Sequence, residues 1–332
     1  MKVVAFFNAR ASARKTSLVY HLAWMYAYLD VNVLAADLDP QGNLTSMFIE
    51  DHELEPFWPQ RGERRTAFGA LRPLVEGAGD VSVPYVAEPD LGLGMIVGDP
   101  LLATAEEELS SQWPACLDHK PRAFRLLSAL PQVLRMGARQ IGAQIILVDV
   151  GPSLGALNRA AILAADAIVV PLATDIHSLQ GLHNLGPTLR RWRKEWRARR
   201  DRNPVEDLET PEGSMRSAGY IVMQRAFRLD QPAGAYRRWR DAIPDVYATE
   251  VAVEDQPSRQ AVNDPDPNCL ATLKPYSSLE PLAREARKPM FALKPADGAT
   301  GGHGVAVREC YRDFKALAET LAQRVGIEVG QL

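Results

Sequence analysis

The chain has 332 residues, of which 46% are hydrophobic and 24% are charged, and its formal net charge at pH 7 is −3. These values exclude a disordered chain and a protein that coats nucleic acid with its whole surface, and they are typical of one large α/β domain with additions. Three widely spaced cysteines, with no leader-like segment and no run apolar enough to span a membrane, favour a cytoplasmic protein without a disulfide framework or a cysteine metal site.

The first elements form a pattern that binds phosphate in other proteins. Residues 3–7 predict a short buried strand, and the apolar spacing from Leu18 to Leu29 predicts a helix. The loop between them, NARASARKTS, ends in Lys15, Thr16 and Ser17. In a standard P-loop at this position, glycine amides wrap the phosphates, the lysine reaches the terminal phosphates and the hydroxyl holds Mg²⁺. Here the lysine and the hydroxyl are present and the glycines are not.

The missing glycines carry an expected cost. Ala11, Ser12 and Arg14 stand where such a loop would carry glycine, and a non-glycine residue forced to positive φ costs about 1–2 kcal/mol. Two or three such positions would lose about 2–6 kcal/mol, or about 30-fold to more than 10⁴-fold in affinity. Against this, Arg10, Arg14 and Lys15 cluster positive charge at a helix N-terminus, which favours an anion. The loop alone leaves both a working and a lapsed site open.

A pair of carboxylates follows the second predicted strand, at 31–36. Asp37 and Asp39 lie in the segment DLDPQGNLT, at the carboxyl end of that strand. Open α/β sheets bind ligands at this edge. Asp-Pro and Gln-Gly-Asn are also ordinary turn sequences, so a purely structural role is an alternative.

A second carboxylate motif follows further along. Before it, the pattern predicts a strand at 91–97 and helices at 66–75, 101–113 and 121–137. The apolar run at 145–148 then predicts a buried parallel strand that presents Asp149 at its tip. Such an acid can hold Mg²⁺ through water, and the N–H of Gly151 can meet a terminal phosphate.

Taken in order, three segments resemble the ParA-type partition ATPases, a deviant Walker A group of the MinD/ParA superfamily: the loop with Lys15 and Thr16, DLDPQGNLT at 37–45, and DVGPSLGALNR at 149–159. The resemblance covers at least residues 1–185. It implies a P-loop NTPase with a doubly wound, mostly parallel sheet flanked by helices. We expect a single domain over residues 1–332, with a core at 1–225 and a C-terminal extension of helices and loops at 226–332.

The resemblance also implies which residues form the site. An ATP and Mg²⁺ site would comprise Arg10, Ala11, Ser12, Ala13, Arg14, Lys15, Thr16, Ser17 and Gly151, with Met223 and Gln224 as base contacts. For Met223 and Gln224, a plain core strand with a polar end is the alternative. Metal ligands would come from Thr16, Asp39 and Asp149, and catalytic roles fall on Asp39, Asp149 and Arg10. Arg10 stands where the family has its signature lysine, and a planar guanidinium does not replace a compact ammonium in a tight site.

The resemblance implies a positioning protein that forms an ATP-sandwich homodimer, binds DNA non-specifically and is stimulated by a ParB-like or other partner. Its cargo would be a plasmid, a chromosome or another assembly. Because the loop glycines are replaced, we expect weakened ATP turnover. The alternative is a non-catalytic pseudo-ATPase that serves as a DNA- or protein-interaction module on the same fold.

A basic run at 190–202 is the main feature of the second half. Eight of its thirteen residues are Arg or Lys, and two are acidic. It could contact DNA phosphates, and the candidate residues are Arg190, Arg191, Arg193, Lys194 and Arg197. In the alternative interpretation, these cations only form the solvated face of a helix whose tryptophans, Trp192 and Trp196, face the core.

The remaining elements are expected at the C-terminal side. The pattern predicts a strand at 218–223, a short basic helix at 236–242, a loop at 265–275 and a helix at 280–286 with Ser278 as its cap. A flexible glycine-rich segment is expected at 298–304. The closing helix, with Phe314, Leu317 and Leu321 on one face, is expected to pack on the domain.

Overall fold

The computed structural model describes residues 1–8, 13–59, 62–224, 233–252 and 266–330. Its strands are β1 (Lys2–Phe6), β2 (Val33–Asp37), β3 (Ala87–Asp90), β4 (Leu93–Ile96), β5 (Ile145–Asp149), β6 (Ala167–Ala173), β7 (Arg216–Met223) and β8 (Cys269–Leu273). Within the described residues these strands form one sheet in the order β3-β4-β2-β5-β1-β6-β7-β8. All neighbours run parallel except β3 and β4. The doubly wound, mostly parallel sheet is therefore confirmed.

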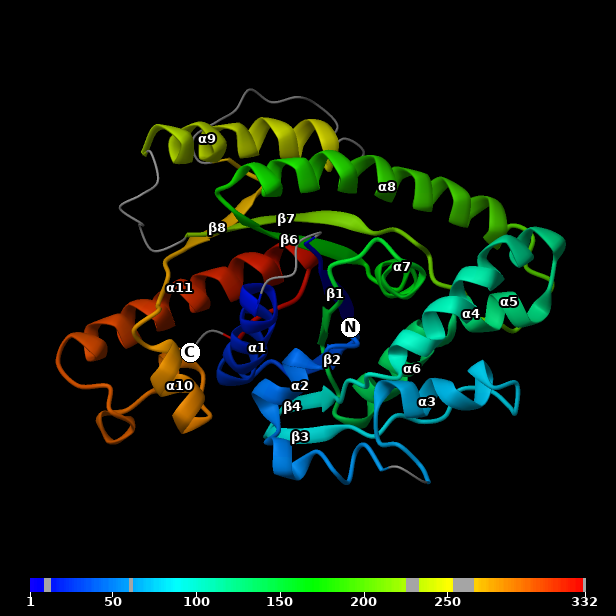
Figure 1. Ribbon diagram of the computed structural model, residues 1–332, viewed down its shortest axis with the longest axis horizontal. Coiled ribbons are helices and arrows are strands. Elements are labelled where there is room, and N and C mark those ends of the chain that lie inside the picture. Colours follow the sequence, from blue (N-terminus) through cyan, green and yellow to red (C-terminus); the bar gives the residue numbers. More distant parts are fainter. Residues whose placement is uncertain (9–12, 60–61, 225–232, 253–265, 331–332) are drawn as a thin grey trace.

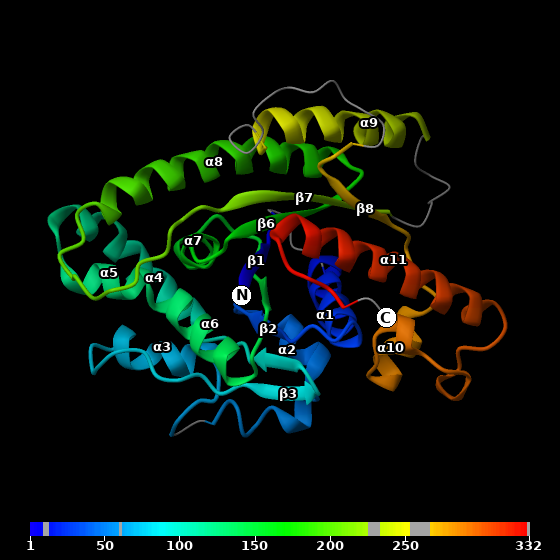
Figure 2. The same ribbon diagram turned by 180° about the vertical axis from the view of Figure 1, so that it is seen from behind.

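Helices cover both faces of this sheet (Figures 1 and 2). They are α1 (Ala13–Tyr28), α2 (Asn43–Phe48), α3 (Ala67–Val75), α4 (Leu102–Ala115), α5 (Pro121–Leu127), α6 (Ala129–Gln140), α7 (Ala156–Leu163), α8 (Ile176–Arg200), α9 (Ala233–Glu250), α10 (Glu280–Ala286) and α11 (Gly302–Val325). Successive residues of β1 serve opposite faces, as the pleat requires. Val3 and Ala5 join the core under α3 to α9, whereas Val4 and Phe6 join the core with α1 and α11.

The central strands are buried along their whole length. Every residue of β2 and β5 is buried, and β1 lies between β5 and β6. Parallel strands covered on both faces need continuous apolar runs, which is why these segments were predicted within a residue or two. Asp37 and Asp149 are the polar exceptions, and both stand at strand ends.

Several predicted elements differ from the structure. The helix predicted at 121–137 is two helices that meet at Ser128, because Pro131 has no N–H to continue the hydrogen-bond ladder of α5. The edge strand β3 was not predicted, since its sequence AEPD contains a proline that only an edge or irregular position tolerates. Helix α9 is longer than the predicted helix at 236–242.

The C-terminal part contributes to the sheet and the core. The predicted loop at 265–275 contains β8, which pairs in parallel with β7, so that prediction was wrong. Helix α10 begins after Leu279 without a side-chain cap, so Ser278 does not cap it. The segment predicted as flexible at 298–304 includes the first turn of α11. As expected, α11 packs on the domain, and the chain after residue 225 supplies a strand as well as helices.

Candidate functional site

The carboxyl ends of β1, β2 and β5 bring the first sequence motif and both carboxylate motifs together. Asp37 pairs in register with Asp149, and Asp149 pairs with Phe6, the last residue of β1. Lys15 and Thr16 lie in the first turn of α1, directly after β1. Lys15 and Thr16 are 3% and 4% exposed, so this turn packs closely against the strand ends.

Asp149 is a buried carboxylate with two side-chain partners. The ammonium of Lys15 contacts the Asp149 carboxylate and the carbonyl of Val150. The hydroxyl of Thr16 donates to the other Asp149 oxygen at 2.7 Å. Burial raises the pKa of Asp149, and the charge of Lys15 opposes that rise. Lys15 and Thr16 thus hold Asp149 in place and partly compensate its charge.

The Asp37 carboxylate anchors the loop that carries Asp39. It accepts hydrogen bonds from the N–H and hydroxyl of Thr45, both at 2.8 Å, and from the N–H of Asp39 at 3.2 Å. Burial, with Asp149 nearby, raises the pKa of Asp37 to about 7. Asp39 is 6% exposed and accepts from the N–H of Gln41 at 3.0 Å. Of this acid pair, Asp37 is structural and Asp39 faces the site.

Asp39 lies beside the loop after β5. A methyl group built on Gly151 would lie 3.5 Å from a carboxylate oxygen of Asp39. The N–H of Gly151 donates to the side-chain oxygen of Asn158 at 3.1 Å, and the Asn158 amide donates back to the carbonyls of Gly151 and Ser153 at 2.9 and 2.6 Å. In this structure, then, the amide predicted to sense a phosphate is held by Asn158. Sequence reasoning missed Asn158, although a lone asparagine in the apolar helix ALNRAAIL was a signal.

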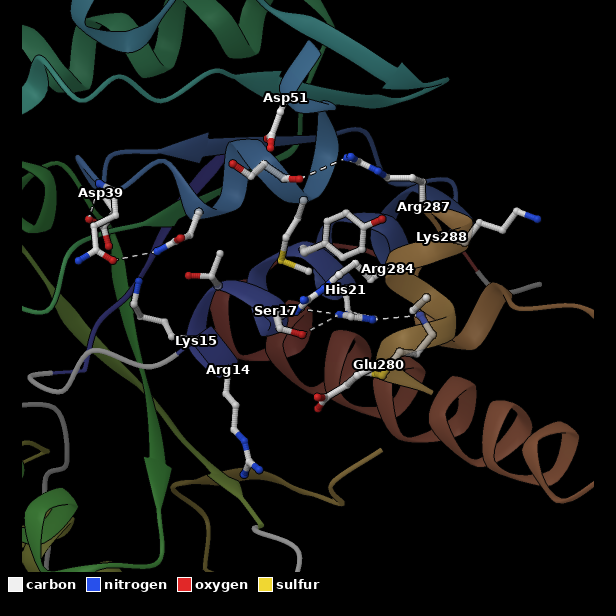
Figure 3. A pocket seen from close by; sticks show the side chains of 18 of the residues that line it. Arg14, Lys15, Ser17, His21, Asp39, Asp51, Glu280, Arg284, Arg287 and Lys288 are labelled. Carbon is white, nitrogen blue, oxygen red and sulfur yellow. Dashed lines mark hydrogen bonds between the residues drawn. The ribbon is translucent and has the colours of Figure 1, made fainter. Parts of the chain in front are cut away.

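The strain expected at Arg14 is absent. Arg14 belongs to α1 and is not among the described non-glycine residues with positive φ, so the cost considered for a positive φ does not arise at this position. Its guanidinium donates to the carbonyl of Gln224 at 2.8 Å, and Figure 3 shows it pointing away from Lys15. Arg10, Ala11 and Ser12 lie outside the described residues. Ala13 is the first residue of α1.

A pocket of about 800 Å³ opens in front of these residues, between α1, α2 and α10 (Figure 3). Its lining includes five cationic side chains, Arg14, Lys15, Arg284, Arg287 and Lys288. Thr16, Ser17 and Asp39 also line it. The volume lies within the range of cofactor sites. A smaller hollow of about 40 Å³ adjoins Arg14 and is lined by Met223 and Gln224, the two predicted base contacts.

The side-chain oxygen atoms near the pocket suit a hard cation that takes its remaining ligands from water or from a bound phosphate. Among the described residues, no group of three or more His, Cys, Asp or Glu side chains is placed to hold a metal ion. A Mg²⁺ ion does not need such a group of protein ligands, because it usually binds one or two carboxylates and completes its coordination shell with water and phosphate oxygens. Thr16 and Asp39 offer oxygen donors at the pocket's inner end, and the buried carboxylate of Asp149 lies directly behind Thr16.

Sequence reasoning also missed His21, which fixes one wall of the pocket. Its Nδ1–H donates to the carbonyl of Ser17 at 2.6 Å, and its Nε2 accepts from the N–H of Met290 at 3.1 Å. The ring stacks on Phe314 with centroids 5.0 Å apart. Burial lowers the pKa of His21 from 6.5 to about 4. The neutral ring therefore links α1 to the segment after α10.

This environment predicts a pH dependence of stability. The unfolded chain protonates His21 below about pH 6.5, whereas the folded chain does so only near pH 4. The stability contribution of His21 is thus complete above about pH 6.5 and is lost as pH falls toward 4. We expect wild type to lose up to about 3 kcal/mol more than His21→Phe between neutral pH and pH 4, measured by urea unfolding.

The effect of His21 must be separated from that of other groups that change their protonation over the same pH range. Asp37 has the opposite effect, because its raised pKa favours the folded state as pH falls, but it is present in both proteins and cancels in the difference. His177 is exposed, and we expect His177→Gln to keep the wild-type pH dependence. Parallel curves for wild type and His21→Phe would contradict a buried neutral histidine.

The basic run lies on α8, and its residues divide into two groups. Trp192 and Trp196 are buried in the core, as expected for the helix face. Arg193 is 4% exposed and donates to the carbonyls of Ser214 and Met215, so it is not available to DNA. Arg190 binds the carbonyl of Glu250, at the end of α9. The exposed cations that remain among the five candidates are Arg191, Lys194 and Arg197.

No helix in the described ranges is long and apolar enough to cross a membrane.

Comparisons with known proteins agree with the geometry. A family model described as an AAA domain matches residues 1–201. The chain is 29% identical over 190 residues to the sporulation initiation inhibitor protein Soj of Bacillus subtilis, covering 57% of this chain and 65% of Soj. It is 30% identical over 198 residues to the chromosome partitioning protein ParA of Caulobacter vibrioides, covering 58% and 64%. The matched part thus spans less than two thirds of these relatives.

Two solved structures share the fold over nearly the whole chain. A protein from Corynebacterium diphtheriae has a TM-score of 0.73 at 21% identity, with 98% of each chain covered. An ATP complex of a Cyanothece McdA variant has a TM-score of 0.63 at 15% identity, covering 100% of this chain and 98% of the other. With the family match over more than half of its length, the chain belongs to the AAA domain family and, within it, to the ParA-type P-loop proteins.

Proposed function

We propose that this chain is a ParA-like positioning protein that binds ATP with Mg²⁺ in the pocket between α1, α2 and α10. One observation carries the proposal. Lys15, Thr16 and Asp39 line one end of a pocket of about 800 Å³, and the buried Asp149, from a third segment, lies behind them in contact with Lys15 and Thr16. Such a convergence of a lysine, a hydroxyl and two carboxylates suits a phosphate chain with its cation.

The chain's own groups have distinct roles in this proposal. Lys15 supplies the cation for terminal phosphates, and Thr16 and Asp149 supply oxygens toward Mg²⁺. When bound, Mg²⁺ would neutralise phosphate charge. Asp39 lies next to Gly151, where a carboxylate can orient a water molecule. Arg10, which replaces the signature lysine, would take part from the partner subunit of a dimer.

Turnover in this site is proposed to be slow rather than absent. Lys15 already compensates Asp149, and the Gly151 amide is held by Asn158, so both must be released before they can meet a phosphate. These rearrangements add to the cost of the replaced glycines at 11 and 12. A non-catalytic interaction module on the same fold is the second candidate, supported by the same two internal bonds.

The proposal extends to assembly, DNA binding and a cytoplasmic location. We propose a nucleotide-dependent homodimer that binds non-specific DNA through the exposed cations of α8 and responds to a ParB-like or other partner. The support is the similarity to Soj of Bacillus subtilis and ParA of Caulobacter vibrioides, together with Arg191, Lys194 and Arg197 on one exposed face.

Calorimetric titration of ATP into the purified protein, with and without Mg²⁺, tests the proposal. We expect micromolar binding with Mg²⁺. Thr16→Val keeps the shape of the side chain but removes the oxygen, and it should weaken binding about 10-fold or more, equivalent to about 1.4 kcal/mol, only when Mg²⁺ is present. No binding to the folded wild type at millimolar ATP would favour the non-catalytic module.

A further inference from the structure

Helix α10 and the two residues that follow it place three cations on the outer wall of the pocket, Arg284 in the helix and Arg287 and Lys288 after it. Two of them have anionic or carbonyl partners. Arg287 lies 3.5 Å from Glu50 and donates to the carbonyl of Ser46 at 3.3 Å. Lys288 donates to both oxygens of Asp297, at 2.7 and 3.0 Å.

Arg284 differs from its two neighbours. Within the described part of the chain it forms no hydrogen bond and no ion pair. Figure 3 shows it extending from α10 into the pocket, toward the first turns of α1, where Ser17 and His21 lie. It is a cation directed into a pocket whose other end holds Lys15.

The wall that carries Arg284 is fixed relative to α1. Leu279, directly before α10, is fully buried. After α10, the N–H of Met290 donates to the neutral ring of His21 on α1. Anchors on both sides hold α10 at a set distance from the phosphate-binding turn, so Arg284 does not depend on a mobile tail for its position.

The inner end of the pocket lacks spare positive charge. Lys15 contacts Asp149, and Arg14 donates to the carbonyl of Gln224. Positions 11 and 12 before α1 and position 14 in its first turn carry no glycine that would bring amides close to a phosphate. A polyanion entering this pocket therefore needs a donor from elsewhere. A guanidinium supplies a planar fork that matches phosphate oxygens.

We propose that Arg284 binds the phosphate chain of the nucleotide, as a donor supplied within the same chain by α10. The inference deepens the proposed function and rests on it, since the ligand of this pocket is a nucleoside triphosphate. Arg284 takes over part of the role that loop glycines have in other phosphate-binding turns. It is a binding residue that, among the residues the structure describes, forms no hydrogen bond or ion pair with the protein.

The test is calorimetric titration of two probes, ATP with Mg²⁺ and inorganic tripolyphosphate, into wild type and Arg284→Ala. We expect the variant to weaken binding of both probes about 10- to 100-fold, as for a lost hydrogen bond to a charged group. Arg284→Lys should recover only part of the affinity. Arg308→Ala removes an exposed charge from α11, outside the pocket, and should bind like wild type.

The outcomes separate this inference from the proposed function. Wild-type affinity in Arg284→Ala, or an equal loss in Arg308→Ala, would overturn the role of Arg284 while ATP binding stands. Tripolyphosphate binding that depends on Arg284, without ATP binding, would support Arg284 and overturn the nucleotide proposal. Binding of neither probe to folded wild type would overturn both.

Discussion

Replacing Lys15 with alanine is expected to lower the free energy of unfolding by about 3–5 kcal/mol, because it leaves the buried Asp149 without its cation. Asp149 is fully buried, and its remaining side-chain partner is the hydroxyl of Thr16. Urea unfolding at neutral pH measures the change. The loss should shrink at lower pH, because Asp149, whose pKa burial already raises, then takes up a proton and no longer needs a counter-charge.

Two further variants make the Lys15 experiment specific. Lys120 is exposed, and Lys120→Ala should change stability by no more than about 0.5 kcal/mol. In an Asp149→Asn background, Lys15→Ala should cost less than in wild type, because no buried charge is left unpaired. A loss below about 1 kcal/mol for Lys15→Ala would mean that the pair contributes little to the fold. The role of Lys15 would then be to bind the ligand and not to stabilise the fold.

Charge reversal on the exposed face of α8 is expected to abolish most DNA binding. Replacing Arg191, Lys194 and Arg197 with glutamate should weaken binding to a non-specific duplex about 100-fold or more at low salt, and lower the salt slope by about 0.9 for each lost phosphate contact. None of the three forms a hydrogen bond or ion pair with the rest of the described chain, so stability should change little. Fluorescence anisotropy with and without ATP and Mg²⁺ measures the affinity.

Arg193 on the same helix is the matched control. Arg193→Ala should lower stability by about 1–3 kcal/mol, because buried carbonyls of Ser214 and Met215 lose their donor. The folded fraction should still bind DNA like wild type. If the triple glutamate variant bound DNA normally, the basic face of α8 would be a solvated surface, and DNA contact would have to lie elsewhere.

The sequence alone predicted the central strands of the sheet and the carboxylates at their ends. Continuous apolar runs fix the buried parallel strands because both faces of those strands need apolar cover. The carboxylates after two of these runs were each predicted at the carboxyl end of a strand, and the structure pairs Asp37 and Asp149 in register at that edge. Polar or short segments gave weaker signals. The edge strand β3 was missed because its four residues include a proline, and β8 was missed because its five residues lie between the turn-forming prolines Pro267 and Pro275.

Only the tertiary structure decided how individual side chains are used. Arg14 meets Gln224 across 210 residues of sequence, and His21 meets Met290 across 269. Local periodicity carries no information about such partners, since it reports which face of an element is buried and not what lies against it. The same reason explains why the sequence could not separate buried Arg193 from exposed Arg191, or show that Arg284 points into the pocket. Those outcomes depend on packing between segments that are distant in the chain.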